Sequence, residues 1–376
     1  MNKNTKILFF YQSGRKDKLK SQQPYAEEMF YGYQYFKNKK YNVEIIEFSE
    51  YKKILNKIYY FVFEKNFRNI IKLPVYWSFL TNNKNVNKLI SSDYAVFSNN
   101  RVGFAALPII TIAKLLRKKP LTLCFVMGLF SRKPKYKILR PIQKILLIYF
   151  LKNFDKLIFL SKSEYEYASI NFEKYKSNFH ILPFAVDLKI WKKNVNLEKK
   201  KQILFVGNDG FRDYNFAKQL ANQLTEHKFV FVTQQIDKKD VLYNSNIYPG
   251  SWAQNSLSDN ELASLYNESY ITIVPLKNSL QPSGQSVTLQ SIACGTPVLI
   301  SKTDGFWDSE NFKNKENLVL IDKNNIENWK DEISNLLENK GLHKKIQENG
   351  IKLIKELYDL ESFSNKIEEI LGISDD

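Results

Sequence analysis

The chain has 376 residues, of which 44% are hydrophobic, a net charge of +17 and only two cysteines, Cys124 and Cys294. These values favour a folded protein of two ordinary domains in a reducing compartment, and they exclude a disordered chain and a disulfide framework. Three scattered histidines give no zinc-site spacing, and no apolar run reaches the roughly 18 residues that span a bilayer. We expect no metal, no transmembrane segment and no signal peptide.

Apolar runs of strand length alternate with helical patterns through the first 190 residues. The runs lie at residues 6–11, 42–48, 94–98, 121–126, 156–161 and 179–184. Uninterrupted apolar strands that helices separate are typical of a parallel sheet covered on both faces.

A charged stretch without periodicity, WKKNVNLEKKK at 191–201, reads as a linker, after which the alternation resumes. Its apolar runs lie at residues 202–207, 229–234, 270–276, 297–301 and 317–322. We therefore predict an α/β protein with two Rossmann-like, doubly wound parallel-sheet domains, at 1–190 and 202–359. A last helix in 360–376 is expected to pack back on the first domain. Ligands of such sheets bind at the carboxyl ends of the strands.

The positive charge is concentrated in the first half of the chain. Residues 1–190 contain 34 Lys and Arg against 13 Asp and Glu, whereas the remainder contains 22 against 26, and residues 101–150 contain no acid. This asymmetry predicts a basic surface for an anionic partner, which could be a membrane, a phosphorylated acceptor or nucleic acid. Lysine enrichment from an A/T-rich genome is the alternative explanation.

A neutral loop, Ser283-Gly284-Gln285, leads from the strand that ends near Leu276 into a helix closed by Gly295. The start of a helix has unpaired N–H groups and a partial positive charge, and glycine allows close approach of a phosphate. The loop therefore suits a diphosphate. Alternatively, Ser283 only caps the helix and Gly284 only makes a turn.

A similar loop follows the strand at 202–207, where Gly207, Asn208 and Gly210 precede Arg212. The guanidinium of Arg212 offers a fixed fork for phosphate oxygens, although it could instead be a loop charge paired with Asp213. Two such loops on neighbouring strands predict a nucleotide diphosphate site. The GxGxxG fingerprint of dinucleotide enzymes is absent after the first strand.

Four segments of the second half, namely FHILPFAVDLKIWK, ILFVGNDGFRD, LSDNELASLYNESYITIVPL and SIACGTPVLIS, resemble the "glycosyl transferases group 1" family. The resemblance extends over about residues 156–370. This is a large family of retaining nucleotide-sugar glycosyltransferases. The resemblance implies the GT-B fold, with two facing Rossmann-like domains and an interdomain cleft. It also implies a nucleotide diphosphate sugar as co-substrate and no cofactor.

The resemblance assigns roles to individual residues. Arg212 stands where the family has its phosphate-binding lysine and Asn208 where it has arginine, and Trp252 follows a segment beside the nucleotide base. The expected donor-binding residues are Gly207, Asn208, Arg212, Ser251, Trp252, Ser283, Gly284, Gln285, Ser286, Val287 and Gln290. Arg212 and Gln285 are predicted to be catalytic.

The sequence departs from the family at two places. The family commonly has two glutamates separated by seven residues, and these positions are Pro282 and Gln290 here. The amide of Gln290 could still bind ribose hydroxyls, and Gln285 could replace the missing first acid. No histidine lies near Met127 and Gly128, where the family often has one.

Acceptor binding is expected on the basic first domain, through Gly14, Arg15, Arg101 and Lys162 at predicted strand ends. No general base stands out there, and this favours retention, in which the leaving phosphate takes the acceptor proton. The basic and apolar stretch at 131–154 is either core or a contact with an anionic leaflet.

We therefore predict a cytoplasmic hexosyltransferase, peripheral on the inner face of the membrane, that extends a glycan or lipid-linked acceptor in bacterial surface polysaccharide or lipopolysaccharide synthesis. One alternative is a catalytically inactive subunit that binds nucleotide sugar or glycan, which the changes at Pro282 and Gln290 would fit. Another is a nucleic-acid-binding protein. We do not expect nucleic acid as a partner, because no binding motif accompanies the positive charge.

Overall fold

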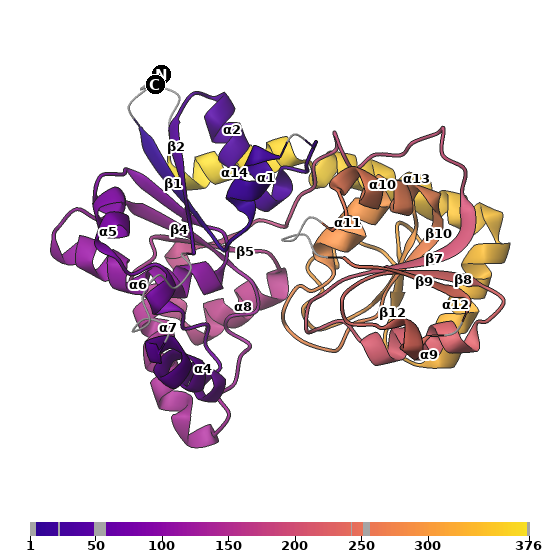
Figure 1. Cartoon of the computed structure of the whole chain (residues 1–376), viewed down its shortest axis with the longest axis horizontal. Helices are drawn as coiled ribbons and strands as arrows, with labels where there is room; N and C mark the ends of the chain where they lie inside the picture. The colour runs from indigo at the N-terminus through magenta and orange to yellow at the C-terminus, as the bar shows by residue number, and fades with distance from the viewer. Residues whose placement is uncertain (1–4, 22, 49–57, 242, 251–255, 374–376) are drawn as a thin grey trace. The chain divides into compact units, whose positions relative to one another are not determined.

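The computed structural model describes residues 5–21, 23–48, 58–241, 243–250 and 256–373. These residues form two compact units. The first comprises Met1–Lys20, Phe30–Leu182 and Ser364–Asp376, and the second comprises Ser21–Met29 and Pro183–Phe363. Each unit contains a parallel β-sheet with helices packed on it (Figure 1).

The described strands of the first unit form one sheet in the order β2-β1-β3-β4-β5-β6, and every pair is parallel. They are β1 (Lys6–Tyr11), β2 (Asn42–Glu47), β3 (Tyr94–Phe97), β4 (Leu121–Val126), β5 (Lys156–Phe159) and β6 (Phe179–Ile181). All six were predicted from their apolar runs. The central strands β1, β3, β4 and β5 are buried along nearly their whole length, which requires apolar residues on both faces.

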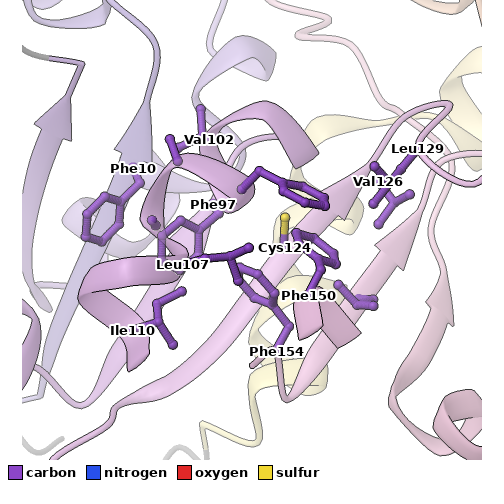
Figure 2. Close-up of a cluster of buried hydrophobic side chains, with 14 of the residues drawn as sticks. Phe10, Phe97, Val102, Leu107, Ile110, Cys124, Val126, Leu129, Phe150 and Phe154 are labelled. Carbon is purple, nitrogen blue, oxygen red and sulfur yellow. The ribbon is translucent and has the colours of Figure 1, made fainter. Parts of the chain in front are cut away.

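Helices surround this sheet, and α6 lies at the centre of the core. The helical elements are α1 (Arg15–Lys20), α2 (Tyr33–Asn38), η2 (Tyr60–Glu64), α4 (Lys65–Ile71), η3 (Trp77–Phe79), α5 (Asn83–Ile90), α6 (Asn100–Leu115), η4 (Lys137–Leu139), α7 (Arg140–Leu151), α8 (Lys162–Asn171) and η5 (Glu173–Asn178). Figure 2 shows side chains of α6, such as Leu107, packed among Phe97, Cys124 and Phe150. Gly103 lets α6 approach closely, since a Cβ there would lie 2.7 Å from Sγ of Cys124.

The described strands of the second unit form a parallel sheet in the order β12-β11-β10-β7-β8-β9. They are β7 (Lys200–Val206), β8 (Lys228–Val232), β9 (Ser245–Tyr248), β10 (Ser269–Val274), β11 (Val298–Ser301) and β12 (Val319–Ile321). The helical elements are η1 (Glu28–Phe30), α9 (Tyr214–Gln223), η6 (Lys238–Asp240), α10 (Asp259–Glu268), α11 (Gln285–Ala293), α12 (Ile326–Glu338), α13 (Lys340–Leu357) and α14 (Leu360–Leu371), with η1 and α14 at the boundaries between units.

The order of strands reverses once in each sheet. In the first unit the chain passes from β1 outward to β2 and then returns to the other side of β1 as β3. In the second unit it passes from β7 to β8 and β9 and returns beside β7 as β10. Open α/β sheets bind ligands outside the carboxyl ends of the strands at such a reversal. Ligands are therefore expected at the loops after β7 and β10 and at those after β1 and β3.

The units differ from the expected domain ranges. The second unit begins at Pro183 and includes Ser21–Met29. Residues 191–201, expected to be a linker, pack on the second unit. Trp191 is buried, and the ammonium of Lys199 donates to the carbonyl of Ser269 at 2.8 Å. The high charge of this stretch hid the buried Trp191 at its start and the partly buried Lys199 near its end.

Most of the C-terminal helix α14 belongs to the first unit, where Glu368 binds residues of α2 and its end. This carboxylate accepts hydrogen bonds from the hydroxyl of Tyr35 at 2.6 Å and the ammonium of Lys39 at 2.7 Å. Among the helices in the described ranges, α13 and α6 included, there is none with the length and apolar character needed to cross a bilayer.

Candidate functional site

The loop after β7 holds Arg212 in a buried position at the carboxyl end of the strand. The residue is only 2% exposed, its Nε donates to the carbonyl of Val206 at 3.3 Å, and its Nη1 lies 2.9 Å from Oδ2 of Asp209. Despite this ion pair, Nη1 has no well-aligned hydrogen-bond acceptor within the described part of the chain. The guanidinium is therefore fixed in place and keeps donor capacity. Its partner is Asp209, and the alternative pairing with Asp213 is wrong.

Gly207 is required by the packing of Arg212. A Cβ at Gly207 would lie 2.5 Å from Nε of Arg212 and 3.0 Å from its Cγ. Glycine here lets the arginine side chain lie directly over the backbone that ends β7. Arg212 and Gly207 therefore act together, which the sequence pattern alone did not show.

We expect Gly207→Ala to weaken the binding of a nucleotide diphosphate by about tenfold or more, because the added methyl group displaces a guanidinium whose hydrogen bonds to phosphate are charge-assisted. Isothermal titration of both proteins measures this. Gly210→Ala is the matched control, since a Cβ at Gly210 meets no atom within 4 Å. Equal affinities of the two variants would contradict the role given to Gly207.

The loop after β10 delivers the start of α11. Gly284 is the N-cap residue, with a left-handed φ of 84°, and a Cβ there would lie 2.9 Å from Cγ1 of Val274. The first-turn amides of an α-helix have no partner inside the helix. The hydroxyl of Ser283 is buried and makes no hydrogen bond among the described residues, so it does not cap α11.

Backbone contacts join the two loops. Arg212 and Leu276 form an antiparallel bridge, the amide of Asp213 donates to the carbonyl of Pro275 at 2.9 Å, and that of Lys277 donates to Phe211 at 2.8 Å. A Cβ on Gly284 would in turn lie 3.5 Å from Cδ1 of Leu276. Arg212 and the start of α11 thus converge on the end of β10, as expected for the strand reversal.

The remaining expected donor-site residues fall into three groups. Asn208 links the loop after β7 to the residues that follow β8 and β9. Its Oδ1 accepts from the amide of Gln234 at 2.7 Å, and its Nδ2 donates to the carbonyl of Gly250. Gln285, Ser286 and Val287 form the first turn of α11, with Gln285 and Val287 buried and Ser286 partly exposed. The expected base-contacting residues Ser251 and Trp252 lie outside the described residues.

Gln290 lies in the interior of the second unit. Its Nε2 donates to Oε1 of Glu28 at 3.0 Å, and its Oε1 accepts from the hydroxyl of Tyr266 at 3.4 Å. Both ends of the amide therefore have protein partners, and this arrangement differs from the expected ribose contact. The sequence reasoning missed Glu28, because 262 positions separate it from Gln290.

Glu28 is a buried carboxylate with several donors. Oε1 also accepts from Nε1 of Trp191 at 2.7 Å, and Oε2 accepts from the amide of Asp187 at 3.2 Å. Burial raises the pKa of Glu28 to about 7, against the lowering effect of the hydrogen bonds from Gln290 and Trp191. These contacts hold the segment Ser21–Met29 on the second unit.

In the first unit, Gly14 and Arg15 follow β1 and Arg101 follows β3, at the strand reversal of that sheet. Arg15 lies over the ring of Tyr11 and Arg101 over that of Tyr76, at 5.6 and 5.3 Å from the ring centroids. Lys162 begins α8 after β5, and β4 separates that strand from β3. All four acceptor candidates thus follow strands at the carboxyl edge of the sheet, the first three at the strand reversal and Lys162 two strands away from β3.

A second buried carboxylate, Glu164, was also missed. It accepts hydrogen bonds from the amides of Gly128 at 2.6 Å and Phe130 at 3.1 Å, and burial raises its pKa to about 7. Glu164 therefore fixes the loop after β4. A signal was present, because Ser161 three residues earlier caps α8 by accepting from the amide of Glu164 at 3.3 Å.

Within the described ranges, no three His, Cys, Asp or Glu side chains are grouped as they would be around a metal ion. That the protein needs no metal and no cofactor stays a prediction.

Comparisons with known proteins agree with this architecture. The family model described as Glycosyl transferases group 1 matches residues 252–353. No curated protein matches the chain in sequence.

Solved structures match nearly the whole chain. HepE from Anabaena, in complex with UDP and glucose, aligns over 99% of this chain and 100% of its own with a TM-score of 0.67 and 11% identity. Sucrose-phosphate synthase from Thermosynechococcus elongatus aligns over 98% of each chain with a TM-score of 0.65 and 12% identity. A glycosyltransferase from Rickettsia africae aligns over all of both chains with a TM-score of 0.66 and 14% identity. The chain therefore has the GT-B fold, and its residues 252–353 match the glycosyl transferases group 1 family.

Proposed function

We propose that this protein transfers a hexose from a nucleotide diphosphate sugar to a glycan or lipid-linked acceptor, with retention of configuration. The observation that carries the proposal is the pair of loops after β7 and β10. They bring the buried Arg212 guanidinium and the start of α11 to the strand reversal of one sheet. HepE, which is similar in fold, was solved with UDP and glucose, and this supports UDP-glucose as the first donor to test.

The polar groups of this edge suit a diphosphate. Among the described residues, Ser283 Oγ is buried without a hydrogen-bond partner, and Arg212 Nη1 is buried with only its ion-pair contact to Asp209. The first turn of α11 adds its amides. A buried polar atom without a partner costs free energy unless a ligand satisfies it. Diphosphate oxygens would accept from both side chains and from the helix start.

In the proposed reaction the bond between C1 of the sugar and the diphosphate oxygen breaks, and a bond forms between C1 and the acceptor oxygen on the same face. The acceptor proton passes to the departing diphosphate, so no protein base is needed. Negative charge grows on the diphosphate as the bond breaks, and Arg212 with the α11 amides would stabilise it in place.

The acceptor is proposed to bind the basic first unit at the edge formed after β1 and β3, near Arg15 and Arg101. We further propose that the enzyme works at the inner face of a bacterial membrane, in the synthesis of a surface polysaccharide or lipopolysaccharide. The excess of basic residues in the first half of the chain supports an anionic acceptor or surface.

The test is a panel of UDP-, GDP- and ADP-sugars, with a CMP-sugar as the monophosphate control, followed by thermal melting and nucleotide release. A donor at about 100 times its dissociation constant stabilises the folded state by about 2.7 kcal/mol, so we expect Tm to rise by about 5 to 10 °C. Slow nucleotide release should accompany the rise for that donor. A rise without release, even with membrane extract as acceptor, would favour a non-catalytic binding subunit. No response to any donor would refute the proposed site.

A further inference from the structure

The first unit exposes large apolar side chains on η2 and α4. Five outward residues of these two elements are 36% to 62% exposed: Phe61, Val62, Phe63, Phe67 and Ile70. The opposite face is packed, because the ring of Tyr60 contacts that of Phe79 and Glu64 accepts from the amide of Ser78 at 2.8 Å. The helix is thus anchored on one side and leaves aromatic rings in solvent on the other.

A second exposed apolar group lies on the adjoining η4 and α7. Tyr136, Ile138, Ile142 and Ile145 are 45% to 84% exposed. Two hydrogen bonds join these elements to the end of α4: the amide of Lys135 donates to the carbonyl of Ile70 at 2.8 Å, and Nε2 of Gln143 donates to Ile71 at 2.9 Å. Figure 1 shows α4 and α7 next to each other. We name the outward surface of η2–α4 and η4–α7 the α4–α7 face.

The charges on the α4–α7 face are all positive. Its exposed cations are Lys65, Lys72, Lys133, Lys135, Lys137, Arg140 and Lys144. Between Asp93 and Asp155 the sequence has no acidic residue, and Glu64, the acid of η2, is buried. Surfaces that bind anionic membranes typically combine lysines with exposed aromatic and branched aliphatic residues, as this face does.

A cavity of about 380 Å³ lies between α7, the segment after β4 and α8. It is lined by the cationic residues Arg132, Lys133, Arg140 and Lys144, and its apolar lining includes Phe130 and Leu147. The cavity has the chemistry of a phosphate headgroup site with room for the first carbons of a lipid.

We propose that the α4–α7 face docks on a bilayer of anionic phospholipids, with phosphate headgroups against its cations and the cavity. The inference rests on the proposed function, which it deepens by naming the surface that brings the enzyme to a lipid-linked acceptor. The surface of an ordinary protein carries charges of both signs, so an interface for such a partner would also carry both. The α4–α7 face carries only positive charges, which complement a uniformly anionic surface. A second copy of the chain is disfavoured for the same reason, since the face would meet its own cations.

The experiment is co-sedimentation of the full-length protein with phosphatidylcholine vesicles, with and without phosphatidylglycerol, at low and high salt. We expect binding that requires phosphatidylglycerol and declines at high salt. Phe63→Ser and Ile142→Ser should each lower the partition coefficient by about tenfold, because an apolar side chain no longer enters the interface. Lys137→Ala and Lys144→Ala should each lower it by about fivefold.

Matched controls lie on the second unit, where Leu357→Ser removes an exposed apolar side chain and Lys352→Ala removes an exposed lysine. Both should bind vesicles like the wild type, and the melting response to a donor should be the same in all six variants. Equal losses in the control and face variants, or wild-type binding without phosphatidylglycerol, would overturn the inference. A protein that responds to a donor but not to vesicles loses only this inference, whereas one that binds vesicles but responds to no donor loses the proposed function.

Discussion

Replacing Arg212 by alanine is expected to lower the turnover of the nucleotide sugar by about 10²- to 10³-fold. A positioned donor that stabilises charge developing in the transition state is worth about this much. Arg212 is buried and held by Val206 and Asp209, so its guanidinium is preorganised and needs no rearrangement when the diphosphate departs. The measurement is the rate of nucleotide release at saturating donor.

The fold should survive this substitution, because Asp209, the ion-pair partner, has a side chain that is 38% exposed and can be solvated. Arg212→Lys should recover part of the rate, since lysine keeps the charge but not the fork. Lys277→Ala is the matched control, because it removes a cation from the adjoining loop and leaves intact the backbone bond between residues 277 and 211. Wild-type turnover in Arg212→Ala at an unchanged Tm would contradict the role of Arg212.

The sheets could be predicted from the sequence because central parallel strands are apolar at every position. The runs at 6–11 and 121–126 coincide with β1 and β4. The edge strand β9 was missed, because its residues alternate between partly buried and exposed, so Ser245–Tyr248 has no apolar run. The loops after β7 and β10 could also be placed from the sequence, since their position depends on strand ends and on glycine.

The partners of the site residues could not be predicted. The contact of Glu28 with Gln290 joins residues 262 positions apart, and nothing local in SQQPYAEEMF indicates that this segment belongs to the second unit. The contact of Trp191 with Glu28 could not be predicted either. Trp191 is buried, but it begins a stretch whose composition is that of a charged linker. Pairwise polar contacts across a fold leave no periodic pattern in the sequence.

Gln290→Glu is expected to destabilise the second unit by about 3 to 5 kcal/mol at pH 8. The new carboxylate would replace an amide that donates to Glu28 at 3.0 Å, in a buried place. Two buried carboxylates at this distance cannot both ionise without a large cost, and the remaining acid loses one of its donors. Chemical denaturation at several pH values measures the free energy of unfolding.

The free energy of unfolding should fall as the pH rises, in the wild type and more steeply in Gln290→Glu. In the wild type, burial raises the pKa of Glu28 to about 7, so the folded state holds this proton more tightly than the unfolded state. The protonated Glu28 carboxyl thus contributes fully to stability below about pH 4.5, the ordinary pKa of a glutamate. This contribution is lost as the pH rises through about 7, the pKa in the folded state. In Gln290→Glu a second carboxylate strengthens this trend, and the loss of stability between pH 5 and pH 8 should be steeper than in the wild type.

The double variant Glu28→Gln/Gln290→Glu separates charge repulsion from mere crowding. It exchanges the acid and the amide, so a single carboxylate again accepts from a single amide, and the hydroxyl of Tyr266 can donate to residue 290 as before. The amide nitrogen of residue 28 then faces Nε1 of Trp191, which loses its acceptor. We therefore expect the double variant to recover part of the stability lost in Gln290→Glu and to restore the shallower pH dependence. If the double variant stays as unstable as the single one at pH 8, charge repulsion is not the cause of the loss. If it regains stability, repulsion between carboxylates at positions 28 and 290 is the cause, and Glu28 determines that position 290 needs an amide.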